Sequence, residues 1–145
     1  MNESREEPSA GAQIAALDLP AARRAIAGSV ARTPTLRSDE LSELAGTAAA
    51  LKAECLQVTG SFKLRGALRK LSALGERASA GVVTASAGNH ARALAQAARL
   101  RGVECEVFMP ADAAVSKLAA VERLGARVHL EGDSIDEALG SAIES

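Results

Sequence analysis

The chain has 145 residues, and its 17 Lys and Arg nearly balance its 18 Asp and Glu, for a formal net charge of −1. This length predicts about one domain, and the balanced charge provides no broad positive field for nucleic acid or an anionic membrane. Trp and Tyr are absent and Phe occurs twice, which also argues against a base-stacking surface.

The sequence carries no signal for membrane insertion or secretion. Its apolar residues are spread between charges and form no run long enough for a transmembrane helix. The first residues lack the basic and apolar parts of a signal peptide. The two cysteines, Cys55 and Cys105, have neither metal-ligand nor CxxC spacing, so we expect free thiols in a reducing cytoplasm. We therefore expect no nucleic acid and no membrane as partner, and no disulfide framework.

The N-terminal part predicts a leader and one helix. Residues 1–12 are polar and rich in Glu, Ser, Gly and Pro, which is typical of a disordered leader. Asp18 precedes Pro20 and a run of Ala, Ile and Arg residues. An Asp cap followed by Pro in the first turn favours a helix start, and we expect this helix to continue to about Val30.

Shorter and weaker elements follow this helix. The Thr33-Pro34 pair ends the helical stretch. Ser38 then caps a short helix with acidic residues in its first turn, and Gly46 ends it. The segment Ala48–Glu54 indicates a strand only weakly, because Ala disfavours extended structure.

A regular alternation of helices and apolar strands begins after a turn and cap at Thr59-Gly60-Ser61. The expected helices, each ended by a glycine except the last, cover about residues 62–74, 90–101, 113–124 and 134–143. The expected strands are the apolar runs 81–85, 103–109 and 126–130. Strands and helices that alternate across short loops predict an α/β fold with a parallel sheet, right-handed crossovers and helices on both faces.

Two sequence strings carry the functional signal. The string T-G-S-F-K-L-R-G-A covers residues 59–67, and A-S-A-G-N-H-A covers residues 85–91. Together they resemble the fold-type II pyridoxal-phosphate enzymes, and most closely their threonine/serine dehydratase branch, which includes threonine ammonia-lyases and serine racemases. The resemblance begins at about Thr33. It implies the three-layer parallel-sheet fold of the tryptophan synthase β-like class and pyridoxal 5′-phosphate as cofactor.

Lys63 is the candidate catalytic residue, since the resemblance implies that it carries the cofactor. It lies at the start of a predicted helix, where the positive end of the helix dipole disfavours a protonated amine. Only a free amine attacks an aldehyde, so this placement suits the chemistry. The alternative is an ordinary solvated lysine. The resemblance also places Phe62 against the cofactor, and the alternative for Phe62 is core packing.

The second string predicts a loop between a strand's carboxyl end and a helix N-terminus, where open α/β sheets bind ligands. Exposed backbone amides at such a point bind anions. The resemblance implies that substrate carboxylate is held by the loop residues Ser86, Ala87, Gly88, Asn89 and His90. It also implies that the Asn89 side chain binds the cofactor's ring oxygen. The alternative interpretation is a simple helix cap.

Ala87 favours one reaction within the family. Relatives that racemise serine carry a second serine here, which can deliver a proton, whereas alanine has none to transfer. We therefore expect elimination, with Lys63 as general base: threonine gives 2-oxobutanoate and ammonia, and serine gives pyruvate and ammonia. Isoleucine biosynthesis is one expected setting. Racemisation and β-replacement remain the enzyme alternatives, and the loop differs from the TSGNT type of cysteine synthases.

The remaining polar residues receive no chemical role. We interpret Cys55, Cys105 and His129 as structural and Glu54 as the end of a strand, and Arg65 has no role that the sequence reveals. No metal site is expected.

Domain organisation is predicted from the resemblance. Residues 13–78 correspond to the start of a large cofactor domain and residues 79–145 to a small α/β domain. Family members are longer and hold the cofactor phosphate with a downstream run of glycines that this sequence lacks. We therefore expect an incomplete enzyme that is truncated, inactive or partner-dependent, from a full-length homo-oligomer. The non-enzymatic alternative is an α/β remnant that binds a small anion or a protein partner.

Overall fold

The computed structural model describes residues 17–144, so the leader predicted for residues 1–12 lies outside the described residues. The helices are α2 (Leu19–Ile26), α3 (Asp39–Ala45), α4 (Lys63–Leu74), α5 (Asn89–Arg101), α6 (Val115–Glu122) and α7 (Ile135–Glu144). The strands are β1 (Thr35–Arg37), β2 (Ala50–Lys52), β3 (Val82–Ala85), β4 (Cys105–Met109) and β5 (Arg127–Leu130). Two 3₁₀ turns, η1 (Glu54–Leu56) and η2 (Gly75–Ala80), complete the chain order.

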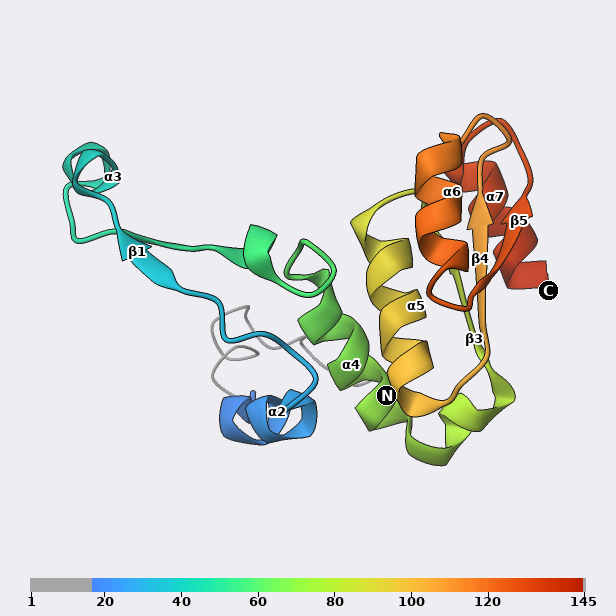
Figure 1. Ribbon diagram of the computed structural model, residues 1–145, viewed down its shortest axis with the longest axis horizontal. Helices are drawn as coiled ribbons and strands as arrows, with labels where there is room; N and C mark the ends of the chain where they lie inside the picture. Colours follow the sequence, from blue (N-terminus) through green and yellow to red (C-terminus); the bar gives the residue numbers. More distant parts are fainter. Residues whose placement is uncertain (1–16, 145) are drawn as a thin grey trace, which may run out of the picture.

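A parallel sheet of three strands forms the centre of the C-terminal part. Its order is β3-β4-β5, and β4 lies in the middle with both neighbours parallel to it. Helices α5 and α6 lie on one side of the sheet and α7 on the other (Figure 1). This arrangement confirms the predicted α/β fold with a parallel sheet, and it explains why β4 is an almost continuous apolar run.

The core lies between the sheet and two packed helices. Helix α4 packs along α5, and its Leu64 and Leu68 are fully buried. On the α5 side the contact surface is built from alanines, which allow the two helix backbones to approach closely. Val107 and Met109 of the central strand β4 are fully buried in the same core. Full burial of one such leucine stabilises the fold by about 1.5–3 kcal/mol relative to an exposed one.

Helix α2 is shorter than the sequence predicts. Its start is confirmed, because the Asp18 Oδ1 atom accepts a hydrogen bond from the Ala21 amide at 2.8 Å. The helix ends at Ile26 and not near Val30, because the chain turns at Gly28 with a φ of +78°. A positive φ is costly for other residues, so Gly28 sets the end of the helical stretch.

Residues 33–56 are here called the arm: their middle part, with β1 and α3, extends away from the rest of the molecule (Figure 1), and their ends lie near α4. The short helix α3 forms the tip, capped by Ser38 and ended by Gly46 as predicted. Strand β1, which the sequence does not reveal, pairs antiparallel with β2. The predicted strand Ala48–Glu54 is wrong in its length: only Ala50–Lys52 is extended, and the chain enters η1 at Glu54.

Two further observations concern the predicted surroundings of the protein. Across the described residues 17–144, no helix combines the length and apolar character needed to cross a membrane. Cys55 is exposed and Cys105 is buried, and both are free thiols. Burial, together with the nearby Glu106 carboxylate, raises the pKa of the Cys105 thiol to about 11, so this thiol is a core residue and not a nucleophile.

Candidate functional site

Lys63 is the first residue of helix α4. Its side chain is exposed, and its Nζ atom lies 5.2 Å from the centre of the Phe62 ring, within the range of a cation–π interaction. Phe62 is 60% exposed, so it is not a core residue in this structure. An exposed aromatic ring beside an exposed amine forms a surface that can cover a flat ligand.

The turn before Lys63 differs from the sequence prediction in one respect. Ser61 was expected to cap α4, but no side chain caps this helix, whose N-cap position is Phe62. Gly60 has a φ of +75°, and its amide donates to the Gln57 carbonyl at 2.7 Å. This tight turn directs the flanking Thr59 and Ser61 side chains inward, where both hydroxyls are buried and have no hydrogen-bond partner. Unpaired buried hydroxyls are rare and costly in native proteins.

The second string forms the predicted loop between strand β3 and helix α5. The Ser86 amide donates to the Phe108 carbonyl at 3.0 Å, which fixes the loop to the carboxyl end of the sheet. The Ser86 Oγ atom accepts a hydrogen bond from the Gly88 amide at 3.3 Å, so its own O–H remains available to donate. Asn89 and His90 are exposed at the start of α5, which has no side-chain cap. The first amides of this helix are therefore open to an anion.

The fold brings the two strings to one end of the molecule. Helices α4 and α5 lie side by side and start at the same end, so their N-termini face the same region (Figure 1). Partial burial and the positive charge of Lys63 both lower the pKa of His90 below 6.5. The charge effect requires that the Lys63 ammonium and the His90 imidazole lie near each other. A primary amine, an amide side chain and two uncapped helix N-termini are thus gathered in one place.

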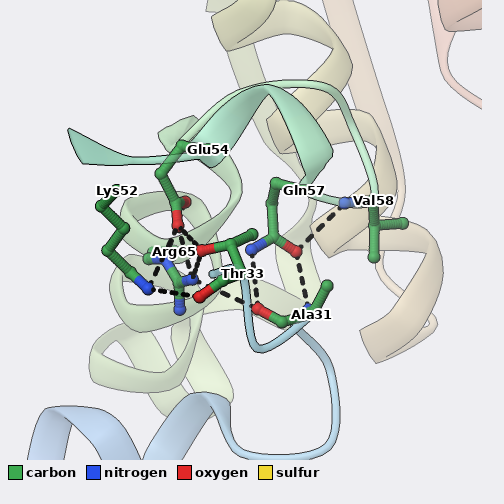
Figure 2. Close-up of polar contacts among 7 residues, drawn as sticks. All are labelled: Ala31, Thr33, Lys52, Glu54, Gln57, Val58 and Arg65. Atoms are coloured by element: carbon green, nitrogen blue, oxygen red, sulfur yellow. Dashed lines mark hydrogen bonds and ion pairs between the residues drawn. The ribbon is translucent and has the colours of Figure 1, made fainter. Parts of the chain in front are cut away.

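Sequence reasoning missed a group of polar side chains beneath this end of α4. Arg65 binds Glu54 through two hydrogen bonds, from Nε to Oε2 at 2.9 Å and from Nη2 to Oε1 at 2.7 Å (Figure 2). Glu54 also accepts a bond from the Thr33 hydroxyl at 2.5 Å. Lys52 donates to the Thr33 carbonyl at 3.0 Å. We call Thr33, Lys52, Glu54, Gln57 and Arg65 the polar cluster.

Electrostatics within the polar cluster are strong. The hydrogen bonds from Arg65, opposed by burial and helped by the Thr33 hydroxyl, lower the pKa of Glu54 to about 2. The same pairing raises the pKa of Arg65. Glu54 is therefore an anion at every physiological pH and serves as a hydrogen-bond acceptor, not as a proton carrier.

A sequence signal for this pairing exists in hindsight. Arg65 lies in the first turn of a helix, where the helix dipole disfavours a cation. A nearby carboxylate stabilises such a residue, and Glu54 is an acidic residue close before it in the chain.

The other residues that the sequence singles out lie elsewhere. His129 is on β5, where its ring stacks on Phe108 with ring centres 4.5 Å apart and its Nε2 atom lies 2.9 Å from Glu106. These contacts give His129 a structural role, and no catalytic role is needed to explain its position. Cys55 lies in η1 and is exposed.

Comparisons with known proteins give the family context. Residues 26–144 match the family model described as "Pyridoxal-phosphate dependent enzyme". The chain is 45% identical over 127 residues to an L-threonine ammonia-lyase of Thermotoga maritima, which covers 87% of this chain and 32% of that protein. The chain spans about a third of the length of the curated relatives that it matches.

Solved structures show the same likeness. A maize serine racemase matches with a TM-score of 0.76 and 36% identity, over 86% of this chain and 38% of the racemase. The processed form of threonine deaminase isoform 2 from Solanum lycopersicum matches with a TM-score of 0.71 and 38% identity, over 79% of this chain and 32% of the deaminase.

Proposed function

Because the chain belongs to the fold-type II family of pyridoxal-phosphate dependent enzymes, we propose that it provides the cofactor lysine and the substrate loop of an ammonia-lyase. The proposed substrates are L-threonine and L-serine. The observation that carries this proposal is the placement of Lys63 and of residues 86–89, here called the Asn89 loop, at the same end of two adjacent helices. They are close enough for the charge of Lys63 to affect His90.

The residues present fit the aldehyde and ring of pyridoxal phosphate. Lys63 offers a primary amine on the surface, with an exposed aromatic ring next to it. Asn89 offers an exposed amide, and the buried hydroxyls of Thr59 and Ser61 lack partners in the turn that leads to Lys63. The phosphate end is a different matter, since the described residues 17–144 contain no run of glycines that would surround it.

The reaction would use the chain's residues in separate roles. When bound, pyridoxal phosphate supplies an electron sink for the substrate Cα atom. Lys63 and Asn89 would hold it, with Phe62 as a further contact. Lys63 Nζ then accepts the proton from the substrate Cα as general base. The Ser86 hydroxyl and the first amides of α5 bind and orient the substrate carboxylate.

The net chemistry is elimination followed by hydrolysis. The β-hydroxyl of the substrate leaves as water. A water molecule later takes the place of the amino group at the Cα atom, and the amino group is released as ammonia. Threonine then gives 2-oxobutanoate, and serine gives pyruvate. We propose elimination over racemisation because Ala87, half-buried against the core, has no proton to transfer. Racemisation is the second candidate, because 86% of this chain matches the maize serine racemase at 36% identity.

We further propose that activity depends on sequence equivalent to the other two thirds of these relatives. The lack of a glycine run for the phosphate in residues 17–144 supports this dependence. In this proposal residues 13–78 belong to a large domain, residues 79–145 form a small domain, and the full-length protein is a homo-oligomer. The two free thiols, Cys55 and Cys105, suit a cytoplasmic setting.

The test is chemical labelling of the lysine. The purified chain is incubated with pyridoxal phosphate, reduced with borohydride, and analysed by peptide mass spectrometry. We expect most of the label on Lys63 and its loss in a Lys63→Ala variant, whereas Lys70→Ala, a lysine of the same helix, keeps the label. Label spread evenly over the lysines of the wild-type chain would contradict the proposal that this chain alone builds the lysine site. It would mean that the phosphate-binding sequence of the longer relatives is required, or that the chain is a non-catalytic α/β remnant.

Product analysis on a separate sample, with the chain and pyridoxal phosphate but without borohydride, separates the reactions. Release of a 2-oxo acid and ammonia from L-threonine or L-serine supports the ammonia-lyase. Formation of D-serine without a 2-oxo acid would instead support the racemase, and turnover of O-acetylserine alone would support β-replacement.

A further inference from the structure

The polar cluster lies directly beside the segment that carries Lys63. We infer that Glu54, Gln57 and Arg65 are positioning residues, which fix the turn and the first helical residues around Lys63 so that its amine faces the Asn89 loop. This inference rests on the proposed role of Lys63 as the cofactor lysine.

Helix geometry explains why Arg65 can orient Lys63. Successive residues of an α-helix are rotated by about 100°, so Lys63 and Arg65 project to either side of Leu64. Leu64 is fully buried in the core. Arg65 binds Glu54 on one side, so the Lys63 side chain leaves the helix on the other side. A rotation of the first turn of α4 would therefore have two effects at once: it would break the two Arg65–Glu54 bonds, and it would displace the Lys63 amine.

Gln57 provides a second anchor before Lys63. Its buried side chain binds the backbone of Ala31 twice, by accepting from the amide at 2.7 Å and donating to the carbonyl at 3.1 Å (Figure 2). The same Oε1 atom accepts from the Val58 amide at 3.1 Å. The Gln57 carbonyl accepts from Gly60. The turn that ends at Lys63 is thus bonded at its start by Gln57 and after its end by Arg65.

Both anchors are tied to a single stretch of backbone. Arg65 Nη2 donates to the Ala31 carbonyl at 3.2 Å, the same oxygen that accepts from Gln57. Thr33, two residues later, donates its hydroxyl to Glu54. Residues 31–33 therefore connect the two sides of the Lys63 turn, and a shift at one anchor is transmitted to the other. This closed arrangement argues for positioning and not only for general stability.

Charge gives the pair a second effect on Lys63. Two cations in one helical turn repel each other, and Arg65 follows Lys63 by two residues. The Glu54 carboxylate lies 2.7 Å from the Arg65 guanidinium and neutralises it. Lys52 lies farther from the same carboxylate, at 3.9 Å. Without Glu54, the Arg65 charge would no longer be neutralised, and only its weaker bonds to Ala31 and Thr33 would hold its side chain.

The test compares Glu54→Gln with Glu106→Gln in the full 145-residue chain. Glu106 is a matched control, because it also binds an arginine at 2.6 Å but lies on the sheet. The first readout is the rate of borohydride-trapped pyridoxal-phosphate label on Lys63 relative to the other lysines. Misplacement of a reacting group by about 1 Å can cost up to about a hundredfold in rate. We expect a loss of about tenfold or more in Glu54→Gln, partial recovery in Glu54→Asp, and a wild-type rate in Glu106→Gln.

A second readout works without cofactor and without the labelling reaction. Hydrogen exchange is followed at three amides of this turn: Val58, bonded to Gln57 Oε1, Gly60, bonded to the Gln57 carbonyl, and Arg65, bonded to the Phe62 carbonyl. We expect exchange at these amides to rise in Glu54→Gln by more than its lower thermal stability explains, and to stay at the wild-type rate in Glu106→Gln. Gln57→Ala is expected to speed exchange at Val58 in the same way, and it replaces Glu54→Gln if that variant fails to fold.

Each result decides between distinct alternatives. If Glu54→Gln labels Lys63 as fast and as selectively as the wild-type chain, the positioning role is wrong. If its label loss only follows the loss of thermal stability across all variants, the cluster is merely structural. If the wild-type chain shows no preference for Lys63, the proposal that this chain alone builds the lysine site fails. The exchange rates then decide the positioning role alone: local acceleration supports it, and unchanged rates reject it.

Discussion

The α/β unit, residues 63–144, and the arm use the same apolar residue types in opposite ways. In the α/β unit, Leu64, Leu68 and their neighbours are removed from solvent between α4, α5 and the sheet. In the arm, leucines lie on the surface of short elements and the two strands are exposed along their length. The arm is held by backbone pairing and by hydrogen bonds of Ser38, Ser42 and Thr33. Cooperative stability should therefore reside in the α/β unit, with the polar cluster as the joint between the two regions.

The largest expected effect comes from removing one buried leucine of the α/β unit. Leu68→Ala should lower the free energy of unfolding by about 2–5 kcal/mol, because it deletes packed methyl groups and leaves a cavity. Leu68 is 0% exposed, whereas Leu44 at the tip of the arm is 86% exposed. Leu44→Ala should change this free energy by less than about 0.5 kcal/mol. Urea denaturation followed by circular dichroism measures both; equal losses would show that the arm is part of the cooperative core.

The joint between the regions should be sensitive to acid. The pKa of Glu54 is about 2 in the folded chain and 4.5 as the reference value, so its pairing contributes stability above pH 4.5 that is lost as the pH falls through 2. Partial exposure of Arg65 screens the interaction, and we expect about 1–3 kcal/mol.

The measurement compares wild-type and Glu54→Gln chains by urea denaturation at a series of pH values. The wild-type chain should be more stable at neutral pH, and the difference should shrink between pH 4.5 and 2 as Glu54 itself becomes neutral. A constant difference over this window would mean that the carboxylate charge does not support the joint. Glu106→Gln serves as the control for acid effects elsewhere.

Local signals in the sequence were enough for elements whose causes are local. The caps Asp18 and Ser38, the helix ends at Gly46, Gly75 and Gly102, and the α/β alternation each depend on neighbours within a few residues, and the structure confirms them. The helix predicted for 113–124 instead ends at Glu122, with Arg123 and not Gly125 in the cap position. Strand β1 could not be predicted, because it is three residues long, exposed, and fixed only by pairing with β2. The reversal of Ser61 from cap to buried side chain follows from the Gly60 turn, whose direction depends on Gln57.

The candidate site shows the same division. The first-turn placement of Lys63 and the loop before Asn89 follow from short sequence strings, and the structure has both. The Glu54–Arg65 pairing was not predicted, because it requires the arm to return against α4. Its further bond to Thr33 joins residues 21 positions apart in the chain. Contacts of this kind are decided by tertiary closure, which periodicity and capping rules do not describe.

Helix caps give a finer comparison of the two regions. Ser134 accepts a bond from the Glu137 amide at 3.2 Å at the start of α7, and Ser38 accepts one from Leu41 at 3.3 Å at the start of α3. Ser134→Ala should cost about 1 kcal/mol of unfolding free energy, the usual value for a lost cap. Ser38→Ala should cost less than about 0.5 kcal/mol in the same global measurement, because the arm can open locally before the α/β unit unfolds. Equal costs in urea denaturation would show that both regions unfold as one.

A smaller effect is expected for the ion pair on the sheet. Arg127 is bonded to Glu106 at 2.6 Å, but its side chain is 66% exposed, against 29% for Arg65. An exposed pair is weakened by water and salt, so Arg127→Gln should cost no more than about 0.5 kcal/mol. The corresponding Arg65→Gln variant should cost more, because it leaves Glu54 without its main partner. The comparison is made by urea denaturation at low and high salt; a larger cost for Arg127→Gln would reverse the ranking of the two pairs.

The smallest effect on stability concerns Lys63 and His90, which probe how the N-termini of α4 and α5 meet within the α/β unit. Lys63 is exposed, so Lys63→Met should change the free energy of unfolding by less than about 0.5 kcal/mol. The pKa of His90 is lowered by partial burial and by the charge of Lys63. Removing that charge should raise the pKa of His90, which stays below 6.5 because the burial remains. Lys70→Met is the control, since Lys70 lies on the same face of α4 about 10 Å farther along the helix. A pH titration of the His90 ring by NMR measures the shift, and an identical pKa in the wild-type chain and Lys63→Met would show that the two helix N-termini do not face each other in solution.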